Sequence, residues 1–300
     1  MKPNRIDLRA PAKLNLFFEV LGKRPDGYHD ILTVTTPISI YDDLSIEIEP
    51  GGGNGVRLTC VDETGRDLSA FIPADERNLA VRGARALAGE SAVSLPIAIR
   101  LVKRIPSEAG LGGGSSDAAA VLAGLNRLWG LNYPRKRLAQ IAARIGSDVS
   151  LFFEERFAIG TGRGEITEPI PSASSFDLVL VKPPFGLSTA AVYRAAGEVP
   201  PEKRRNPDRL IEALRSGHLV TPFLFNRLEE TARRLSPELD RLFAELARYG
   251  SFRLTGSGTA LYLPVSSSEE ALALKEKIVK AGISGKVFAC STAASPLSQL

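Results

Sequence analysis

Residues 104–129 read R-I-P-S-E-A-G-L-G-G-G-S-S-D-A-A-A-V-L-A-G-L-N-R-L-W. The glycines of this stretch are Gly110, Gly112, Gly113 and Gly114. Glycine tolerates positive φ angles and close approach of the backbone to a ligand. Ser115 and Ser116 follow as candidate N-caps of a helix over residues 118–125. A glycine-rich loop entering a helix directs free N–H groups and the positive end of the helix dipole to one place, which predicts phosphate binding. A flexible turn before a capped, buried helix is the simpler alternative.

This loop is not one of the common phosphate-binding patterns. The chain contains no G-x-x-x-x-G-K-[ST] segment, which argues against the P-loop NTPases. It also lacks the V-A-I-K, H-R-D and D-F-G set of protein kinases. The glycines are too crowded for the dinucleotide-binding pattern G-x-G-x-x-G.

Length and composition indicate a globular protein with a large core. A chain of 300 residues with 44% hydrophobic content predicts two domains. The formal net charge is +4, and the densest basic run, residues 203–205, is typical of a solvated surface loop rather than a nucleic-acid patch. A weakly positive field would still attract a substrate rich in phosphate.

The cysteines and histidines do not form a metal-binding or disulfide pattern. Cys60 and Cys290 lie far apart, and His29 and His218 are the only histidines. Neither zinc spacing nor a disulfide framework results, so we interpret both thiols as small buried residues. The N-terminus has no apolar signal core and no apolar run reaches membrane length, which predicts a cytoplasmic protein.

Upstream of the glycine loop, residues 11–20 predict a strand. Alternation places Lys13, Asn15 and Phe17 on one face, and Leu14, Leu16 and Phe18 on the other. From composition alone, the lysine and asparagine would be an ordinary solvent face. A turn at residues 24–27 then presents Tyr28 beside His29. This aromatic residue could hold a planar base or simply cover the edge of the core.

Periodicity and breaker residues predict the other elements. In the first half of the chain we predict a glycine hairpin tip at 51–55, to which we assign no phosphate role. We also predict helices over 78–87 and 134–145 and a strand over 97–102. Ser147 and Asp148, taken alone, indicate a helix cap. A domain boundary is expected within residues 161–171. Beyond it we predict strands 177–182, 251–255, 260–265 and 286–290, a helix opening at Ser188, and helices 208–215, 226–249 with a break before Pro237, and 267–281.

Several of these segments together resemble the GHMP kinases. The three motifs of that family are matched by P-A-K-L-N-L at residues 11–16, P-S-E-A-G-L-G-G-G-S-S-D-A-A at 106–119 and T-G-S-G at 255–258. The segments E-R-N-L at 76–79, R-P-D-G-Y-H at 24–29 and G-S-D-V at 146–149 lie between or beside them. Each match is weak alone, but their order along the chain is specific. The chain departs from the family pattern at two positions. Ser150 stands where proline is usual, which would loosen its loop, and Arg227 stands where aspartate is common.

The resemblance implies an α+β, two-domain GHMP kinase fold. Residues 1–165 would form an N-terminal, ATP-binding domain similar to ribosomal protein S5. Residues 166–300 would form a C-terminal domain with a ferredoxin-like split β-α-β arrangement. The active site is expected in the cleft between them.

The resemblance also implies ATP-dependent phosphorylation of the 2-hydroxyl of 4-diphosphocytidyl-2-C-methyl-D-erythritol in isoprenoid biosynthesis. Lys13 and Asp148 would be catalytic. The expected ATP-binding residues are Asn78, Lys103, Pro106, Ser107, Glu108, Ala109, Gly110, Leu111, Gly112, Gly113, Gly114, Ser115 and Ser116. The expected substrate-binding residues are Asn15, Tyr28, His29, Thr189, Tyr193, Gly256 and Ser257. Mg²⁺ is expected with the nucleotide, and Asp117 is the one candidate ligand; the metal ligands and the oligomeric state stay open.

Two other functions remain possible at this point. Another GHMP kinase, of the homoserine or mevalonate type, would share the ATP loop but should lack the Tyr28-His29 segment. An RNA-binding module built on the S5-like domain would need basic strands studded with aromatic residues and would have no need for Asp148. The modest net charge argues against this second alternative.

Overall fold

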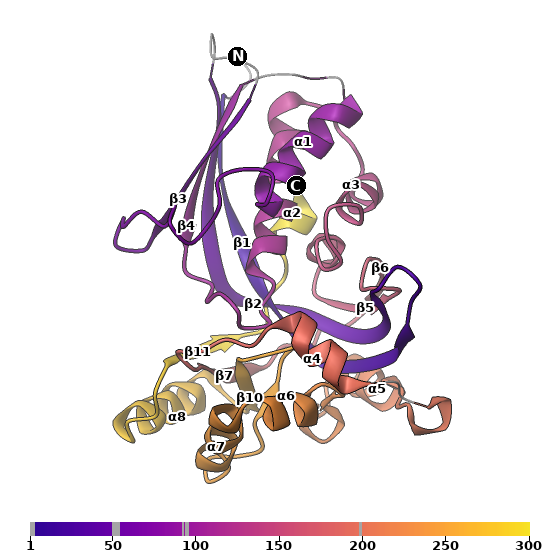
Figure 1. The fold of residues 1–300 in the computed structure, drawn as a ribbon, viewed down its shortest axis with the longest axis vertical. Helices are drawn as coiled ribbons and strands as arrows, with labels where there is room; N and C mark the ends of the chain where they lie inside the picture. The colour runs from indigo at the N-terminus through magenta and orange to yellow at the C-terminus, as the bar shows by residue number, and fades with distance from the viewer. Residues whose placement is uncertain (1–3, 50–54, 92, 94–95, 198–199) are drawn as a thin grey trace.

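The structure is a computed structural model that describes residues 4–49, 55–91, 93, 96–197 and 200–300. The glycine tip predicted at residues 51–55 therefore lies outside the described residues, except for Gly55. Two lobes are stacked along the long axis of the molecule (Figure 1). The predicted two-domain α+β architecture is confirmed.

The upper lobe is built on a seven-stranded sheet. Its main path runs β3 (Val56–Asp62), β4 (Ile97–Lys103), β2 (His29–Ile48), β1 (Arg5–Lys23) and the short β8 (Phe225–Asn226). The hairpin of β5 (Phe157–Thr161) and β6 (Ile166–Ile170) joins the sheet through β2. The β1 and β2 strands pair antiparallel along most of their length, so this long ribbon carries the first motif midway along β1 and the Tyr28 turn at one end.

Three helices, α1 (Leu79–Ser91), α2 (Gly113–Trp129) and α3 (Arg135–Ala142), cover one face of this sheet. The alanine-rich α2 is buried on almost every side. A Cβ atom at Gly124 would lie 2.7 Å from Leu8 Cδ1 and 2.8 Å from Ile46 Cδ1. Small residues thus let α2 lie directly on the strands, which fixes the position of its N-terminus.

The lower lobe contains a four-stranded antiparallel sheet in the order β11 (Lys286–Ser291), β7 (Asp177–Lys182), β10 (Leu261–Val265) and β9 (Arg253–Leu254). Its helices are α4 (Thr189–Ala196), α5 (Asp208–Ser216), α6 (Glu229–Leu235), α7 (Pro237–Leu246) and α8 (Ser268–Lys280). The helix predicted over 226–249 starts later than expected, because Asn226 is paired with β1. The predicted break before Pro237 is present, and the Ser236 side chain caps α7.

The two lobes are joined by more than one connection. The first sheet continues to Ile170 and the second begins at Asp177, so the β5–β6 hairpin spans the boundary predicted at residue 165. From the lower lobe, β8 returns to pair in parallel with β1. The buried Glu19 accepts hydrogen bonds from Arg227 Nε and Nη2, each at 2.7 Å. The chain then ends in the upper lobe, where Leu297 joins the core beneath α2.

The simple alternation expected for β1 is wrong after Asn15. The β1–β2 register shifts between Asn15 and Phe17, which is the mark of a β-bulge. Because the bulge reverses the faces of the following residues, Phe18 rather than Phe17 borders the same cavity as Lys13. Nor is the Lys13 face solvated, since Lys13 and Asn15 are both buried. In the part of the chain that the structure describes, no helix has the length and apolar character needed to cross a membrane.

Candidate active site

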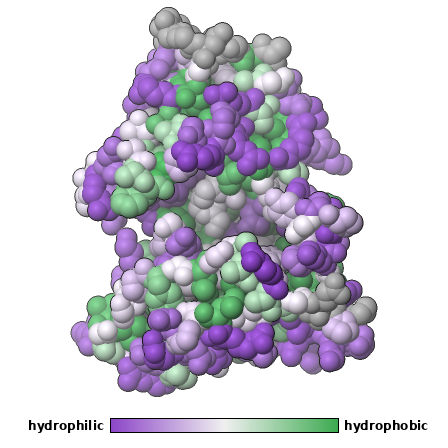
Figure 2. Space-filling model, in the orientation of Figure 1, coloured by the Kyte–Doolittle hydropathy of each residue, from purple (hydrophilic) through white to green (hydrophobic). Residues whose placement is uncertain are grey.

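A cavity of about 1060 Å³ lies between the two lobes. Figure 2 shows the molecule hollowed at this level. Most residues selected from the sequence line it: Lys13, Tyr28, His29, Asn78, Lys103, Pro106, Ser107, Glu108, Ala109, Gly110, Leu111, Gly112, Gly113, Gly114, Ser115, Asp148, Thr189, Tyr193, Gly256 and Ser257. Asn15 and Ser116 do not border the cavity, because both are buried behind it.

The glycine loop leads directly into α2 at one wall of the cavity. Gly110 and Gly112 have φ angles of 74° and 68°, so two of the four glycines adopt the left-handed conformation. The expectation that Ser115 or Ser116 caps the helix is wrong: α2 starts at Gly113, and Gly112 precedes it without a side-chain cap. The first amides of α2 have no intrahelical acceptor. They remain available to an anion in the cavity.

The turn of the third motif packs against this loop. Ala260 N donates to Ala109 O at 3.2 Å, and Thr259 N donates to Glu108 O at the same distance. A Cβ atom at Gly110 would lie 2.1 Å from Thr255 O, so this close approach requires glycine. The two glycine turns, far apart in the sequence, therefore form one rigid wall of the cavity.

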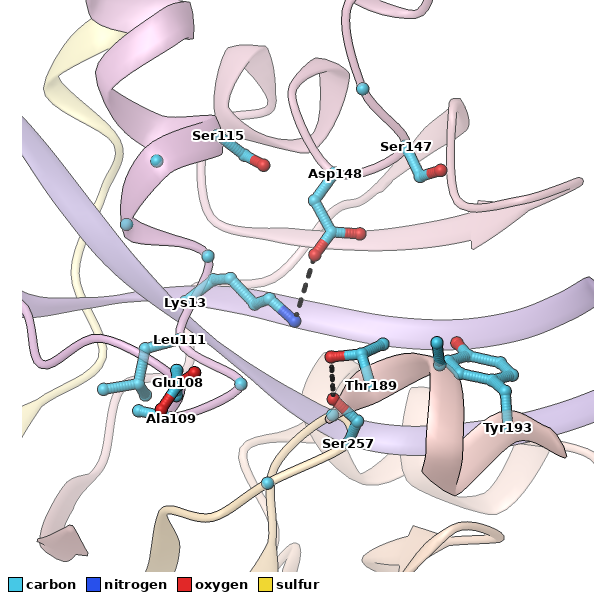
Figure 3. Close-up of a pocket in the computed structure, with 18 of the residues that line it drawn as sticks. Lys13, Glu108, Ala109, Leu111, Ser115, Ser147, Asp148, Thr189, Tyr193 and Ser257 are labelled. Carbon is cyan, nitrogen blue, oxygen red and sulfur yellow. Dashed lines mark hydrogen bonds and ion pairs between the residues drawn. The ribbon is translucent and has the colours of Figure 1, made fainter. Parts of the chain in front are cut away.

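Lys13 and Asp148 meet at the centre of the cavity (Figure 3). Lys13 Nζ lies 3.3 Å from Asp148 Oδ2 and also donates to Asn15 Oδ1 at 2.6 Å. Asn15 Nδ2 in turn donates to Thr33 Oγ1 at 2.9 Å. The Lys13 side chain is only 6% exposed, whereas that of Asp148 is 34% exposed. An accessible carboxylate with an ammonium behind it can accept a proton from a hydroxyl and offset developing negative charge.

The loop that carries Asp148 is held despite the missing proline. Ser150 is buried, and its Oγ donates to Glu165 O at 2.9 Å. Gly164 packs against the same loop: a Cβ atom there would lie 3.3 Å from Ser147 O and 3.4 Å from Asp148 Oδ1. The Ser150 hydroxyl therefore tethers this segment where proline is usual, and the looser loop expected from the sequence stays a prediction.

A buried charge cluster lies beside the first turn of α2. Lys103 Nζ contacts both Asp42 and Asp117. Burial raises the pKa of Asp117 to about 7, although Lys103 opposes this shift. Burial lowers the pKa of Lys103, but the two carboxylates outweigh it and hold that pKa above its ordinary value. Asp42 Oδ1 also accepts from Ile105 N at 2.9 Å, so the cluster fixes the start of the glycine loop.

Aromatic residues from both lobes line the opposite end of the cavity. The Tyr193 ring of α4 lies 5.1 Å from the His29 ring and 6.3 Å from the Phe18 ring, measured between centroids. Burial, together with Lys23, lowers the pKa of His29, which favours the neutral imidazole. Tyr28 is 53% exposed. The hydroxyls of Thr189 and Ser257 are hydrogen-bonded at 2.8 Å between the aromatic end and the third-motif turn.

The sequence did not point to Arg163 or Asn226. Arg163 borders the cavity, and its guanidinium carbon lies 4.9 Å from the centroid of the Tyr28 ring. Its position between two glycines, in G-T-G-R-G-E, was the available signal. Asn226 Nδ2 donates to Leu254 O and Gly256 O, each at 2.8 Å, and so holds the third-motif turn. No local pattern reveals that long-range contact.

Comparisons with known families match both lobes. The "GHMP kinases N terminal domain" model matches residues 78–154, and the "GHMP kinases C terminal" model matches residues 202–284. A protein from Geobacillus sp. (strain WCH70), named 4-diphosphocytidyl-2-C-methyl-D-erythritol kinase, is 39% identical over 264 residues, covering 86% of this chain and 87% of that protein. A protein of the same name from Chromobacterium violaceum is 39% identical, with 87% of each chain covered.

Solved structures give a consistent picture. A crystal structure of 4-(cytidine 5'-diphospho)-2C-methyl-D-erythritol kinase has a TM-score of 0.76 and 31% identity, covering 96% of this chain and 99% of that one. Homoserine kinase from Cytophaga hutchinsonii has a TM-score of 0.73 but only 17% identity, covering 98% and 96% of the two chains. The second similarity concerns the fold alone.

Proposed function

The chain belongs to the GHMP kinase family, and we propose that it transfers the γ-phosphoryl group of ATP to the 2-hydroxyl of 4-diphosphocytidyl-2-C-methyl-D-erythritol. The names of its relatives support this substrate. The observation that carries the proposal is the arrangement of the cavity. A glycine loop suited to phosphate lies at one end and aromatic rings suited to a base lie at the other, with Lys13 and Asp148 between them.

In the proposed reaction, Asp148 accepts the proton of the 2-hydroxyl as that oxygen attacks the γ-phosphorus. The bond from the γ-phosphorus to the bridging oxygen breaks, and ADP leaves. Lys13 offsets the negative charge that develops on the reacting oxygens. Positioning of the reactants can lower the activation free energy by roughly 7–11 kcal/mol. A general base typically raises the rate about 10²–10⁴-fold, which corresponds to near 3–5 kcal/mol of activation free energy. Alignment across the cavity should therefore matter more than the base itself.

The free amides at the start of α2 would bind the ATP phosphates, with the helix dipole adding to their attraction. Asn78 and Lys103 line the cavity near this helix start, because Leu79 lies beside Gly114 and Lys103 contacts Asp117 of α2, and both would face the adenosine. Asn15 and Ser116 would act indirectly, since neither borders the cavity. We assign Asn15 the role of holding Lys13, to which it is hydrogen-bonded.

Mg²⁺ would accompany ATP, but Asp117 does not fit as its ligand. One carboxylate oxygen of Asp117 is already bound by the Lys103 ammonium, which would repel a divalent cation. No group of three or more His, Cys, Asp or Glu side chains suited to a metal ion occurs among the described residues. The ion would therefore be held mainly by phosphate oxygens and water, as Mg²⁺ often is.

The cytosine would stack between Tyr28 and Tyr193, and His29 would hydrogen-bond to its edge. Mevalonate and homoserine have no base to fill this end of the cavity.

The test is ADP production by the purified protein with ATP and one of three acceptors: the cytidine substrate, mevalonate or homoserine. We expect turnover with the cytidine substrate only, and phosphorus NMR of the product should locate the new phosphate on the 2-hydroxyl. Turnover with mevalonate or homoserine, but not with the cytidine substrate, would assign the chain to another branch of the family. Absence of turnover with all three would reject the proposal.

A further inference from the structure

Five cationic side chains border the cavity within the described part of the chain: Lys13, Lys23, Lys103, Arg163 and Arg194. Two of them have been accounted for, since Lys13 contacts Asp148 and Lys103 contacts two buried aspartates. Arg163 differs because of its location. It lies on the turn between β5 and β6, which touches the Asp148 loop, while its guanidinium lies over the Tyr28 ring.

The Arg163 side chain is held in this position by its own turn and by the end of α3. Arg163 N donates to Glu165 Oε2 at 2.5 Å, and Arg163 Nε lies 3.4 Å from Glu165 Oε1. Nη2 donates weakly to Ala143 O at 3.4 Å. The side chain is still 27% exposed. An ordered guanidinium at the cavity wall loses little conformational entropy when it binds an anion.

The path of the substrate supplies the anion. Under the proposed function, on which this inference rests, a diphosphate joins the cytidine to the methylerythritol. If the cytosine lies against Tyr28 and the 2-hydroxyl lies at Asp148, the diphosphate must pass between these two residues. We propose that Arg163 binds this diphosphate and so selects diphosphate-linked acceptors. Its planar fork of N–H donors matches the geometry of phosphate oxygens.

The test uses calorimetric titration of the whole chain with cytidine and with CDP, which share the base but differ in the diphosphate. The variants are Arg163→Gln, which removes the charge, and Arg163→Lys, which keeps the charge without the fork. Arg137→Gln is the matched control, because Arg137 is also paired with a glutamate but does not border the cavity. Because Arg163→Gln loses a charged hydrogen bond, we expect it to bind CDP roughly tenfold more weakly than the unaltered protein. The affinity of Arg163→Gln for cytidine should stay unchanged. The CDP affinity of Arg163→Lys should lie between those of Arg163→Gln and the unaltered protein.

Kinetics provide a second readout. In Arg163→Gln, KM for the cytidine substrate should rise while KM for ATP stays constant, whereas a general loss of structure would change both. The inference is overturned if the ratio of CDP to cytidine affinity is the same in Arg163→Gln, in Arg137→Gln and in the unaltered protein. If the unaltered protein phosphorylates the cytidine substrate and that ratio does not change, only the role of Arg163 fails. If the unaltered protein neither binds CDP nor phosphorylates the cytidine substrate, the proposed function fails as well.

Discussion

The Lys13 ammonium lies 3.3 Å from the Asp148 carboxylate, although the two residues come from a sheet strand and from a loop after α3. The contact is asymmetric, because Lys13 is almost fully enclosed and Asp148 is open to the cavity. Lys13 is also hydrogen-bonded to Asn15, so it has little freedom to turn away. The pair therefore presents one accessible proton acceptor next to a fixed positive charge.

Asp148→Asn should lower kcat by roughly 10²–10⁴-fold and leave KM for both substrates nearly unchanged. The amide keeps the shape of the side chain but cannot accept the hydroxyl proton. Steady-state kinetics test this, with Ser147→Ala as the control on the same loop. Retention of more than about a third of the kcat would remove Asp148 from the reaction.

Gly114→Val should weaken ATP binding by about tenfold or more while the protein stays folded, because it obstructs amides that would bind charged phosphate. A Cβ atom at Gly114 has only Leu79 Cδ1 nearby, at 3.9 Å. Gly113 is a poorer test, because its Cβ atom would lie 3.1 Å from Ile105 Cγ2 and the fold itself would be disturbed. Calorimetric titration with ATP measures the effect. Gly89→Val is the control for placing valine in a helix, because Gly89 lies in an open position of α1 outside the cavity. Equal ATP affinity in Gly114→Val and Gly89→Val would count against the phosphate site.

Tyr28→Ala should raise KM for the cytidine substrate roughly 5- to 150-fold, because stacking contributes about 1–3 kcal/mol per base. KM for ATP should not change. Tyr41→Ala is the control, since Tyr41 also lies under an arginine but outside the cavity. Tyr193→Ala should have the same effect on KM, with some loss of melting temperature because its ring also packs against Phe18. A normal KM for the cytidine substrate in both Tyr28→Ala and Tyr193→Ala would rule out the aromatic clamp.

Asp117 should make the folded protein less stable as the pH rises from about 4 to about 7. Burial raises its pKa from 3.8 to about 7, so in this window the folded state holds a proton that the unfolded chain has released. The free energy of unfolding therefore falls with increasing pH through the window and levels off above it. In Asp117→Asn this contribution is absent, and the stability of the variant relative to the unaltered protein should increase across the same range. Urea unfolding at several pH values measures this difference; a constant difference would contradict the raised pKa.

The sequence predicted features that depend on local chemistry. Clustered glycines before a helix predicted a phosphate-binding loop, and the structure places that loop at the cavity wall with positive φ angles at Gly110 and Gly112. Phosphate binding itself stays a prediction. Alternation failed in β1, where one bulge reversed Phe17 and Phe18. Arg163 and Asn226 were missed because their partners, Tyr28 and Gly256, are distant from them in sequence. The cap expected at Ser115 or Ser116 failed because Gly112 could itself begin the helix in a left-handed conformation.

The return of β8 to the first sheet limits how this protein could be rebuilt. A polypeptide ending near residue 165 would lack β8, the Arg227 partner of the buried Glu19 and the Leu297 side chain that completes the upper core. An uncompensated carboxylate in the interior is strongly destabilising. The upper lobe therefore cannot be exchanged on its own, and recombination with a related enzyme would have to exchange β1 and the segment around Arg227 together.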